Sequence, residues 1–331
     1  MEKIKGNFGF GCMRLPMQGE EVDLAQTKQM VDEFLAQGFN YFDTAHGYIG
    51  GRSETALRTC LTSRYPRESY VLTDKLSGGF FETEADIRPF FARQLAACGV
   101  DYFDFYLMHS QNAENFQQFK ACRAYETAFD LKAEGKIRHV GLSFHDRAEV
   151  LDQILTEYPQ IEVVQIQFNY LDYDDIAVQS RKCYEVCRRH NKPVLVMEPV
   201  KGGSLASMNN EIQGIMKAQN PDLSIPSWAV RFCAGLDNIL TVLSGMSTKA
   251  QLDDNVSYME HFEPLSDKEH EVLKTVVEKL NAIPTIPCTG CRYCVDDCPM
   301  QIHIPDIFRA VNHQKQFGSE DNVDRSGYES A

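Results

Sequence analysis

The sequence predicts an α/β protein whose main body is a (β/α)₈ TIM barrel, followed by a small cysteine-rich C-terminal segment. Eight short runs rich in Val, Ile, Phe and Tyr alternate with longer amphipathic stretches. The runs are apolar on both faces, as buried parallel strands are. Alternating β and α units predict a parallel sheet with crossover helices, and eight units over roughly 250 residues favour a closed barrel.

The eight predicted strands span residues 8–12, 39–43, 70–75, 103–109, 139–143, 163–167, 194–198 and 240–244. The helical patterns span residues 24–37, 84–98, 116–134, 148–157, 176–190 and 227–234. Asp23 is a suitable N-cap for the first helix and Gly38 a suitable residue just beyond its end. Gly99 is a suitable residue just beyond the end of the second helix.

Polar residues stand at or near the C-terminal end of nearly every predicted strand: Asp43, Lys75, His109, Ser143, Gln165, Gln167 and Glu198. In a (β/α)₈ barrel this rim carries the active site. Loop polarity would explain one such residue, but a polar residue at nearly every strand end is a stronger signal for a functional rim.

The composition changes after the barrel. Residues 266–280 form a helical pattern with Ser266 and Glu269 as a capping box, and the linker 281–287 contains two prolines. A short amphipathic stretch, 305–311, precedes a polar tail from residue 314 that we expect to be mobile or held by surface contacts. We therefore predict a barrel domain over residues 1–265 and a second region over residues 266–331.

Charge and hydropathy exclude several classes of protein. The formal net charge of −14 repels nucleic acid and anionic membranes. No run of about 20 apolar residues exists to span a membrane, and the N-terminus lacks the apolar region of a signal peptide. Seven scattered cysteines plus one local group indicate a reduced compartment with one metal site, so we expect a cytoplasmic protein.

Four short segments carry a family resemblance. The segment FNYFDTAHGY (39–48) precedes GRSE (51–54), and VLTDK (71–75) and YLMH (106–109) follow. From about residue 9 to residue 255 the chain resembles the aldo-keto reductase family, which implies the catalytic tetrad Asp43, Tyr48, Lys75 and His109. A core tyrosine beside a structural Asp–Lys pair is the alternative reading of the same residues.

The chemistry of carbonyl reduction requires these residue types. A phenol has a pKa near 10, and we expect the Lys75 ammonium to lower the pKa of Tyr48, the proton donor. Asp43 would hold Lys75 charged and oriented, and His109 would donate a hydrogen bond to the carbonyl oxygen.

The resemblance also implies a nicotinamide cofactor, NADP(H) or NAD(H). The positions that it assigns to cofactor binding are Ser143, Gln165, Gly202, Gly203, Ser204, Leu205, Gly245, Ser247, Gln251 and Asn255. Three departures stand out: Phe144-His145 follows Ser143, Met197 or Glu198 replaces the stacking aromatic, and Gln251 replaces the usual arginine for a 2′-phosphate. Lys249 is the alternative phosphate anchor.

The cysteine group reads C-x₂-C-x₂-C-x₃-C-P, with Cys288, Cys291, Cys294 and Cys298. This spacing is that of a bacterial ferredoxin-like segment and favours one [4Fe–4S] cluster over zinc. In two-cluster ferredoxins the fourth cysteine serves the other cluster. This chain has no second run, so either Cys298 closes its own cluster or a remote thiol such as Cys12 completes it.

The function predicted from these patterns is NAD(P)H-dependent reduction of a small-molecule carbonyl. One alternative is an electron-transfer component that works through the cluster with a protein redox partner. Another is a nucleotide-sensing regulator with vestigial catalysis, which an intact tetrad argues against. A hydride carries two electrons, whereas a [4Fe–4S] cluster accepts one. We therefore expect the cluster to be a structural or sensing element rather than a path for electron transfer. The sequence of the substrate-binding loops of a barrel does not identify the substrate.

Overall fold

The computed structural model describes residues 1, 3–286, 288, 293–296, 298–300 and 302–317. The chain forms two compact units. Unit 1 comprises Met1–Pro199 and Val230–Pro264, and unit 2 comprises Val200–Ala229 and Leu265–Ala331. Residues 200–229 belong to the same unit as residues 265–331.

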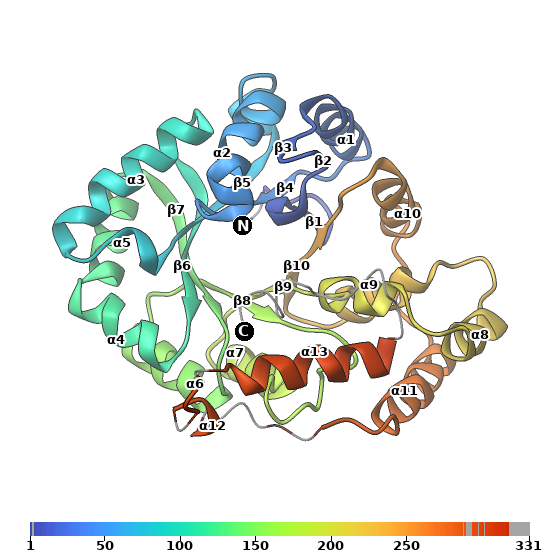
Figure 1. Cartoon of the computed structure of the whole chain (residues 1–331). Helices are drawn as coiled ribbons and strands as arrows, with labels where there is room; N and C mark the ends of the chain where they lie inside the picture. The colour runs from blue at the N-terminus through green and yellow to red at the C-terminus, as the bar shows by residue number, and fades with distance from the viewer. Residues whose placement is uncertain (2, 287, 289–292, 297, 301, 318–331) are drawn as a thin grey trace. The chain divides into compact units, whose positions relative to one another are not determined.

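Unit 1 contains a closed barrel of eight parallel strands (Figure 1). All eight predicted strands are confirmed, with small shifts at their ends. The strands are β1 (Phe8–Gly11), β4 (Tyr41–Asp43), β5 (Val71–Leu76), β6 (Phe103–Gln111), β7 (Ile137–Phe144), β8 (Val163–Gln167), β9 (Val194–Met197) and β10 (Ile239–Gly245). Their order around the barrel is β1-β10-β9-β8-β7-β6-β5-β4. A small antiparallel pair, β2 (Met17–Gln18) and β3 (Glu21–Val22), was not predicted.

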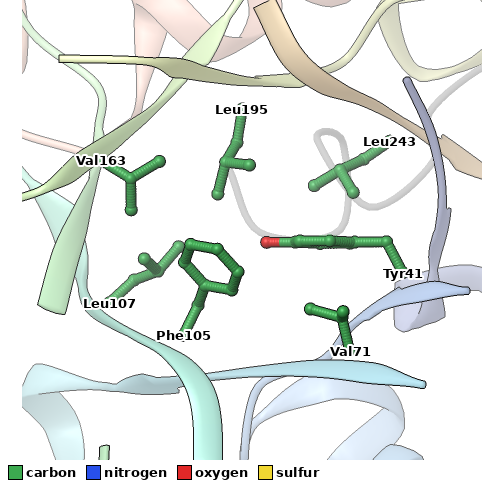
Figure 2. Packing of buried hydrophobic residues seen from close by; sticks show 7 residues of the cluster. All are labelled: Tyr41, Val71, Phe105, Leu107, Val163, Leu195 and Leu243. Carbon is green, nitrogen blue, oxygen red and sulfur yellow. The ribbon is translucent and has the colours of Figure 1, made fainter. Parts of the chain in front are cut away.

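Side chains from the strands fill the barrel interior, as Figure 2 shows. The cluster comprises Tyr41, Val71, Phe105, Leu107, Val163, Leu195 and Leu243. Gly141 gives this layer room, because a Cβ there would lie 2.5 Å from Val163 Cγ1. The packed interior leaves the strand ends as the place for chemistry.

The helices of unit 1 follow the strands. They are α1 (Leu24–Ala36), α2 (Arg52–Leu57), α3 (Glu84–Cys98), α4 (Ala113–Ala121), α5 (Ala124–Ala133), α6 (Ala148–Glu157), α7 (Ser180–Arg189) and α10 (Lys249–Met259). The Asp23 carboxylate caps α1 by accepting a hydrogen bond from the Gln26 amide. Gly99 ends α3 in a left-handed conformation (φ 67°), as predicted.

Two predicted helices of unit 1 were wrong in extent. The single helix expected over residues 116–134 is two helices, because Arg123 adopts a left-handed φ of 52° between α4 and α5. The helix expected from residue 176 begins at Ser180. The Asp175 carboxylate instead holds the amides of Ala177 and Val178 in a turn before it.

Unit 2 is helical in its described part. It contains the turn Lys201–Ala206, here called the glycine loop, then α8 (Asn210–Gln219), α11 (Asp267–Asn281), α12 (Tyr293–Asp296) and α13 (Ile304–Phe317). Helix α9 (Ile225–Ala234) runs from unit 2 into unit 1. The capping box of Ser266 and Glu269 begins α11 as predicted. Helix α13 is longer than the stretch 305–311 predicted for it, and the tail beyond residue 317 lies outside the described residues.

Among the described residues, no helix is long and apolar enough to cross a membrane.

Candidate active site

A buried ion pair forms the centre of the predicted tetrad. Asp43 ends β4 and Lys75 lies on the neighbouring strand β5, and both side chains are nearly inaccessible to water. Lys75 Nζ donates to Asp43 Oδ1 at 2.5 Å and to the Thr44 carbonyl at 2.8 Å. Burial alone would lower the pKa of Lys75, but Asp43 and Tyr48 outweigh it, so the pKa rises and the ammonium persists at working pH.

Tyr48 completes the contacts of the ammonium. Lys75 Nζ donates to the Tyr48 hydroxyl at 3.1 Å and lies 4.7 Å from the centre of its ring. Tyr48 follows β4 in the tight turn that also contains Ile49, whose φ of 54° is left-handed. The turn therefore brings the phenol back over the strand end that carries Asp43.

The pKa of Tyr48 differs from the expected direction. Burial raises this pKa, and the opposing effect of the Lys75 ammonium does not compensate for it. The expectation that Lys75 brings the pKa below its usual value of about 10 is therefore wrong for this structure. Tyr48 keeps its proton at neutral pH, which suits a donor for carbonyl reduction.

His109 lies beside Tyr48. Their ring centres are 5.9 Å apart with an edge-to-face orientation. Burial, followed by the Lys75 charge and His145, lowers the pKa of His109 to about 3, so the ring is neutral. The Ser77 hydroxyl lies 2.7 Å from His109 Nδ1. Sequence reasoning missed Ser77, because a serine two residues beyond a strand end carries no distinctive signal.

Two residues assigned to the nicotinamide lie next to each other in the barrel. Ser143 on β7 is paired in register with Gln165 on β8. Gln165 Nε2 donates to Asp43 Oδ2 at 3.0 Å, which joins it to the tetrad. The Ser143 hydroxyl accepts from the Ser110 amide at 2.8 Å. Both side chains are buried, so their polar atoms have fixed directions.

The residues assigned to the adenosine part of the dinucleotide cofactor lie at the end of β10 and around α10. Gly245 ends β10, and the Arg14 side chain lies against it, with Cδ 3.5 Å from where a Cβ would stand. The Ser247 hydroxyl donates to the Arg14 carbonyl at 2.9 Å, and the Ser247 amide donates to Gln251 Oε1 at 2.7 Å.

The remaining two candidates here are engaged with protein groups. Asn255 is buried, where its amide donates to Ser244 Oγ at 2.9 Å and its carbonyl accepts from the Tyr258 hydroxyl. Lys249, the alternative phosphate anchor, is paired with Glu33 at 2.9 Å and Asp253 at 2.6 Å. These pairs reduce the positive charge that Lys249 can offer a ligand.

The glycine loop of unit 2 contains the other four predicted positions. Gly202 and Gly203 have φ of 65° and 105°, which only glycine adopts readily. No atom of the described residues lies within 4 Å of where a Gly203 Cβ would stand. Ser204 and Leu205 are buried, and the Leu205 amide donates to the Val200 carbonyl at 3.1 Å.

The cysteine segment is described in part. Cys291 lies outside the described residues, and Cys288, Cys294 and Cys298 lie within them. Cys288 and Cys294 are exposed, and Cys298 is half-buried. The Ile302 amide donates to Cys298 Sγ at 3.4 Å, a contact that stabilises a thiolate. The remote candidate Cys12 is fully buried, and burial raises the pKa of its thiol.

A buried acidic group behind the tetrad was missed by the sequence analysis. The ligand atoms of Glu54, Asp74 and Cys98 lie within 4.8 Å of one another. Glu54 Oε2 is paired with His46 Nδ1 at 2.8 Å. Burial raises the pKa of Glu54 to about 7 and that of Asp74 well above its usual value.

The departures from the family pattern also have defined places. Phe144 ends β7 and is buried, whereas His145 beyond it is exposed. Met197 ends β9, and Glu198 follows with a left-handed φ of 56°. The Glu198 carbonyl accepts from Asn169 Nδ2 at 3.2 Å, which holds this unusual turn.

Comparison with known proteins identifies related sequences. The model of the aldo/keto reductase family matches residues 7–278. The NADH-specific methylglyoxal reductase of Escherichia coli is 24% identical over 73% of this chain and 85% of its own length. The L-galactose dehydrogenase of Arabidopsis thaliana is 23% identical over 84% of this chain and 91% of its own length.

Solved structures share the fold. An aldo-keto reductase from Klebsiella pneumoniae in complex with NADPH superimposes with a TM-score of 0.66 at 18% identity, over 82% of this chain and 90% of that one. The holo form of an aldo-keto reductase from Bacillus halodurans gives a TM-score of 0.64 at 24% identity, over 82% and 91% of the two chains.

Proposed function

The chain belongs to the aldo/keto reductase family of NAD(P)H-dependent oxidoreductases, and from that premise we propose that it reduces an aldehyde or ketone with Tyr48 as the proton donor. The observation that carries the proposal is the buried ammonium of Lys75, which contacts Asp43 and the Tyr48 hydroxyl together. An ion pair between Lys75 and Asp43 that served only the structure would not require the half-buried hydroxyl group of Tyr48 beside the ammonium.

Each member of the tetrad has a separate task. Tyr48 donates its proton to the substrate oxygen, and the Lys75 ammonium stabilises the phenolate that remains. Asp43 keeps Lys75 charged and in place, with Gln165 holding the second oxygen of the carboxylate. The Ser77 hydroxyl lies 2.7 Å from His109 Nδ1, and if it donates there, the neutral ring carries its proton on Nε2, where it would bind the same substrate oxygen.

The residues assigned to the cofactor are suitable for a dinucleotide. Within unit 1, Ser143 and Gln165 present buried polar atoms for a carboxamide. Within unit 2, no described residue lies within 4 Å of where a Gly203 Cβ would stand, which leaves room for a phosphate beside the loop amides. When bound, NAD(P)H supplies a hydride to the carbonyl carbon. The protein's part is to hold the substrate oxygen and deliver the proton.

The test of this function is NAD(P)H oxidation with a panel of carbonyl compounds, methylglyoxal and sugar aldehydes included. We expect at least one substrate to support catalytic turnover. Stable nucleotide binding without turnover of any panel member would favour a sensor over an enzyme.

NADH and NADPH should be discriminated weakly. Gln251 bonds to the Ser247 amide, and Lys249 is neutralised by Glu33 and Asp253, so neither offers a full positive charge to a 2′-phosphate. The expected ratio of kcat/KM for NADPH over NADH is below about 10³, which corresponds to about 4 kcal/mol. A larger ratio would require another basic group at this position, such as Arg14, whose side chain lies against Gly245.

We also propose that Cys288, Cys291, Cys294 and Cys298 hold one [4Fe–4S] cluster. The support is the spacing of the four thiols and the amide of Ile302 directed at Cys298 Sγ. The role of such a cluster is structural or sensing, because a hydride donor gives two electrons and a [4Fe–4S] cluster accepts one.

Protein prepared without oxygen should contain about four iron atoms per chain and show a broad charge-transfer absorption. Replacing Cys291 with serine should abolish iron binding, whereas replacing the buried Cys187 should not. NADPH alone should reduce the cluster slowly. Stoichiometric zinc in place of iron would contradict the proposal of a [4Fe–4S] cluster. Reduction of the cluster by NADPH alone at the rate of carbonyl turnover would contradict a structural or sensing role.

A further inference from the structure

Two buried carboxyl groups adjoin the segments that carry Tyr48 and Lys75. Glu54 lies on α2, which begins just after the turn of Tyr48, and Asp74 directly precedes Lys75 on β5. Both carboxyl side chains are at most 1% exposed. They lie close enough to hydrogen-bond to each other. The chemistry assigned to the tetrad uses neither group and does not explain why they are buried together.

Asp74 is surrounded by hydrogen-bond donors. Its Oδ1 accepts from the Lys75 amide at 2.8 Å and from Gln94 Nε2 at 3.1 Å. The Cys98 thiol donates to Asp74 Oδ2 at 3.8 Å, and burial raises the pKa of this thiol, so it keeps its proton. These donors favour Asp74 as the member of the pair that carries a negative charge.

Glu54 lacks such donors. Its Oε2 lies 2.8 Å from His46 Nδ1, but no N–H or O–H group of the described residues donates to the buried Oε1. Two ionised carboxylates this close together and shielded from water would repel each other strongly. A single proton between Glu54 and Asp74 removes one of the charges and supplies the hydrogen bond that Glu54 otherwise lacks.

Glu54 also holds the turn that carries Tyr48. His46, its partner, lies inside that turn, which the Tyr48 amide closes with a backbone hydrogen bond. The His46 ring packs edge-to-face against Phe80 and Phe90, with ring centres 4.7 and 5.0 Å away. The imidazole therefore has a fixed place, and a displacement of Glu54 would be transmitted to the turn.

We propose that Glu54 and Asp74 share one proton, and that this protonated pair positions the tetrad by joining the turn of Tyr48, through His46, to the strand of Lys75. When the pair loses its proton, the two carboxylates repel each other and the turn shifts. The Tyr48 hydroxyl then leaves its contact with the Lys75 ammonium, and proton transfer slows. This inference rests on the proposed function, because the positioned group is the proton donor for carbonyl reduction.

The shared proton makes kcat depend on pH in a range where the tetrad does not titrate. Burial raises the pKa of Glu54 to about 7, whereas burial lowers the pKa of His109 to about 3 and raises that of Tyr48. As the pH rises through about 7, kcat should fall about tenfold, because a misplaced reacting group costs up to about a hundredfold. The other titratable or charged groups around the pair and His46 are Cys12 after β1, Lys75 on β5, Arg93 and Cys98 on α3, and Tyr106 on β6.

The same proton makes stability depend on pH. Glu54 releases it near pH 4.5 in the unfolded chain and near pH 7 in the folded one, so the folded chain binds more protons between these values. The free energy of unfolding should therefore decline as the pH rises through this range. In Glu54→Gln the decline should be smaller, and urea denaturation at a series of pH values measures it.

The decisive measurement is kcat as a function of pH, with saturating NADPH and a carbonyl found by the panel. Glu54→Gln presents a fixed N–H donor to Asp74 and an oxygen to His46, so it should retain most of kcat at pH 6 and lose the fall above pH 7. Asp74→Asn supplies the donor from the other side and should behave in the same way. Glu54→Ala presents neither group and should lower kcat about tenfold even at pH 6.

Glu134→Gln is the matched control. It makes the same chemical change at a position that is about half exposed and pairs with Arg88 on the surface. Its pH profile should match that of the wild type. Circular dichroism confirms that each variant is folded, and either Glu54→Gln or Asp74→Asn alone decides the test.

The outcomes separate this inference from the proposed function. If no carbonyl is turned over, the proposed function fails and the positioning role fails with it. If the wild type turns over carbonyls without a fall in kcat above pH 7, or if the fall persists in Glu54→Gln and Asp74→Asn, this inference alone is overturned. A metal ion that the wild type binds and Cys98→Ala does not would also overturn it, because a cation would then hold the carboxylates together.

Discussion

Replacing Tyr48 with phenylalanine is expected to lower kcat for carbonyl reduction at least a hundredfold, since a positioned proton donor contributes about 10²–10⁴. The substitution removes one oxygen and keeps the ring beside Lys75, so the Kd of NADPH should change little. Burial raises the pKa of Tyr48, and the donor is therefore fully protonated in the wild type at neutral pH. Steady-state kinetics and a nucleotide titration measure the two quantities.

The control for this experiment is Tyr65→Phe. The Tyr65 hydroxyl also donates a hydrogen bond, to Asp32 at 2.5 Å, but neither residue contacts the tetrad. That variant should retain wild-type kcat. If Tyr48→Phe retains more than a few per cent of wild-type kcat, the proton comes from another group.

Replacing Lys75 with methionine is expected to abolish turnover and to lower the free energy of unfolding by about 3–5 kcal/mol. The substitution leaves the buried Asp43 carboxylate without its ammonium partner, with only the Gln165 amide still bonded to it among the contacts described above. An uncompensated buried charge is costly. Urea denaturation measures the change in stability.

Adding Asp43→Asn to Lys75→Met separates stability from catalysis. The double variant removes both charges, so most of the lost stability should return while turnover stays absent. Arg88→Met is the surface control, because the Arg88–Glu134 pair is about half exposed and such pairs contribute about 0–1 kcal/mol. A Lys75→Met protein as stable as the wild type would show that Asp43 is protonated or hydrated in the fold.

The strands were predictable because burial on both faces leaves a continuous apolar signal. Val163–Gln167 was predicted to the residue, and the other seven differ only at their ends. The break at Arg123 carried no signal, since neither glycine nor proline marks the left-handed turn between α4 and α5. Local composition cannot show a backbone conformation that tertiary packing imposes.

The tetrad was predictable from residue types and order, but its electrostatics were not. The sequence places an ammonium near Tyr48, whereas the direction of the pKa shift depends on burial, which only the fold provides. The Thr44 carbonyl that accepts from Lys75 is a backbone group and has no sequence signature. Asn255 likewise has its amide engaged by Ser244 and Tyr258, which the order of residues could not reveal.

The most direct test of carbonyl reduction at the Tyr48 site is isotope transfer. The reductant is NADPH in which both hydrogens at C4 of the nicotinamide are deuterium, the substrate is an aldehyde found by the panel, and the product is analysed by mass spectrometry. We expect an alcohol with one deuterium on the former carbonyl carbon from the wild type, and almost no product from Tyr48→Phe. Alcohol without deuterium, or equal product from the variant, would contradict it.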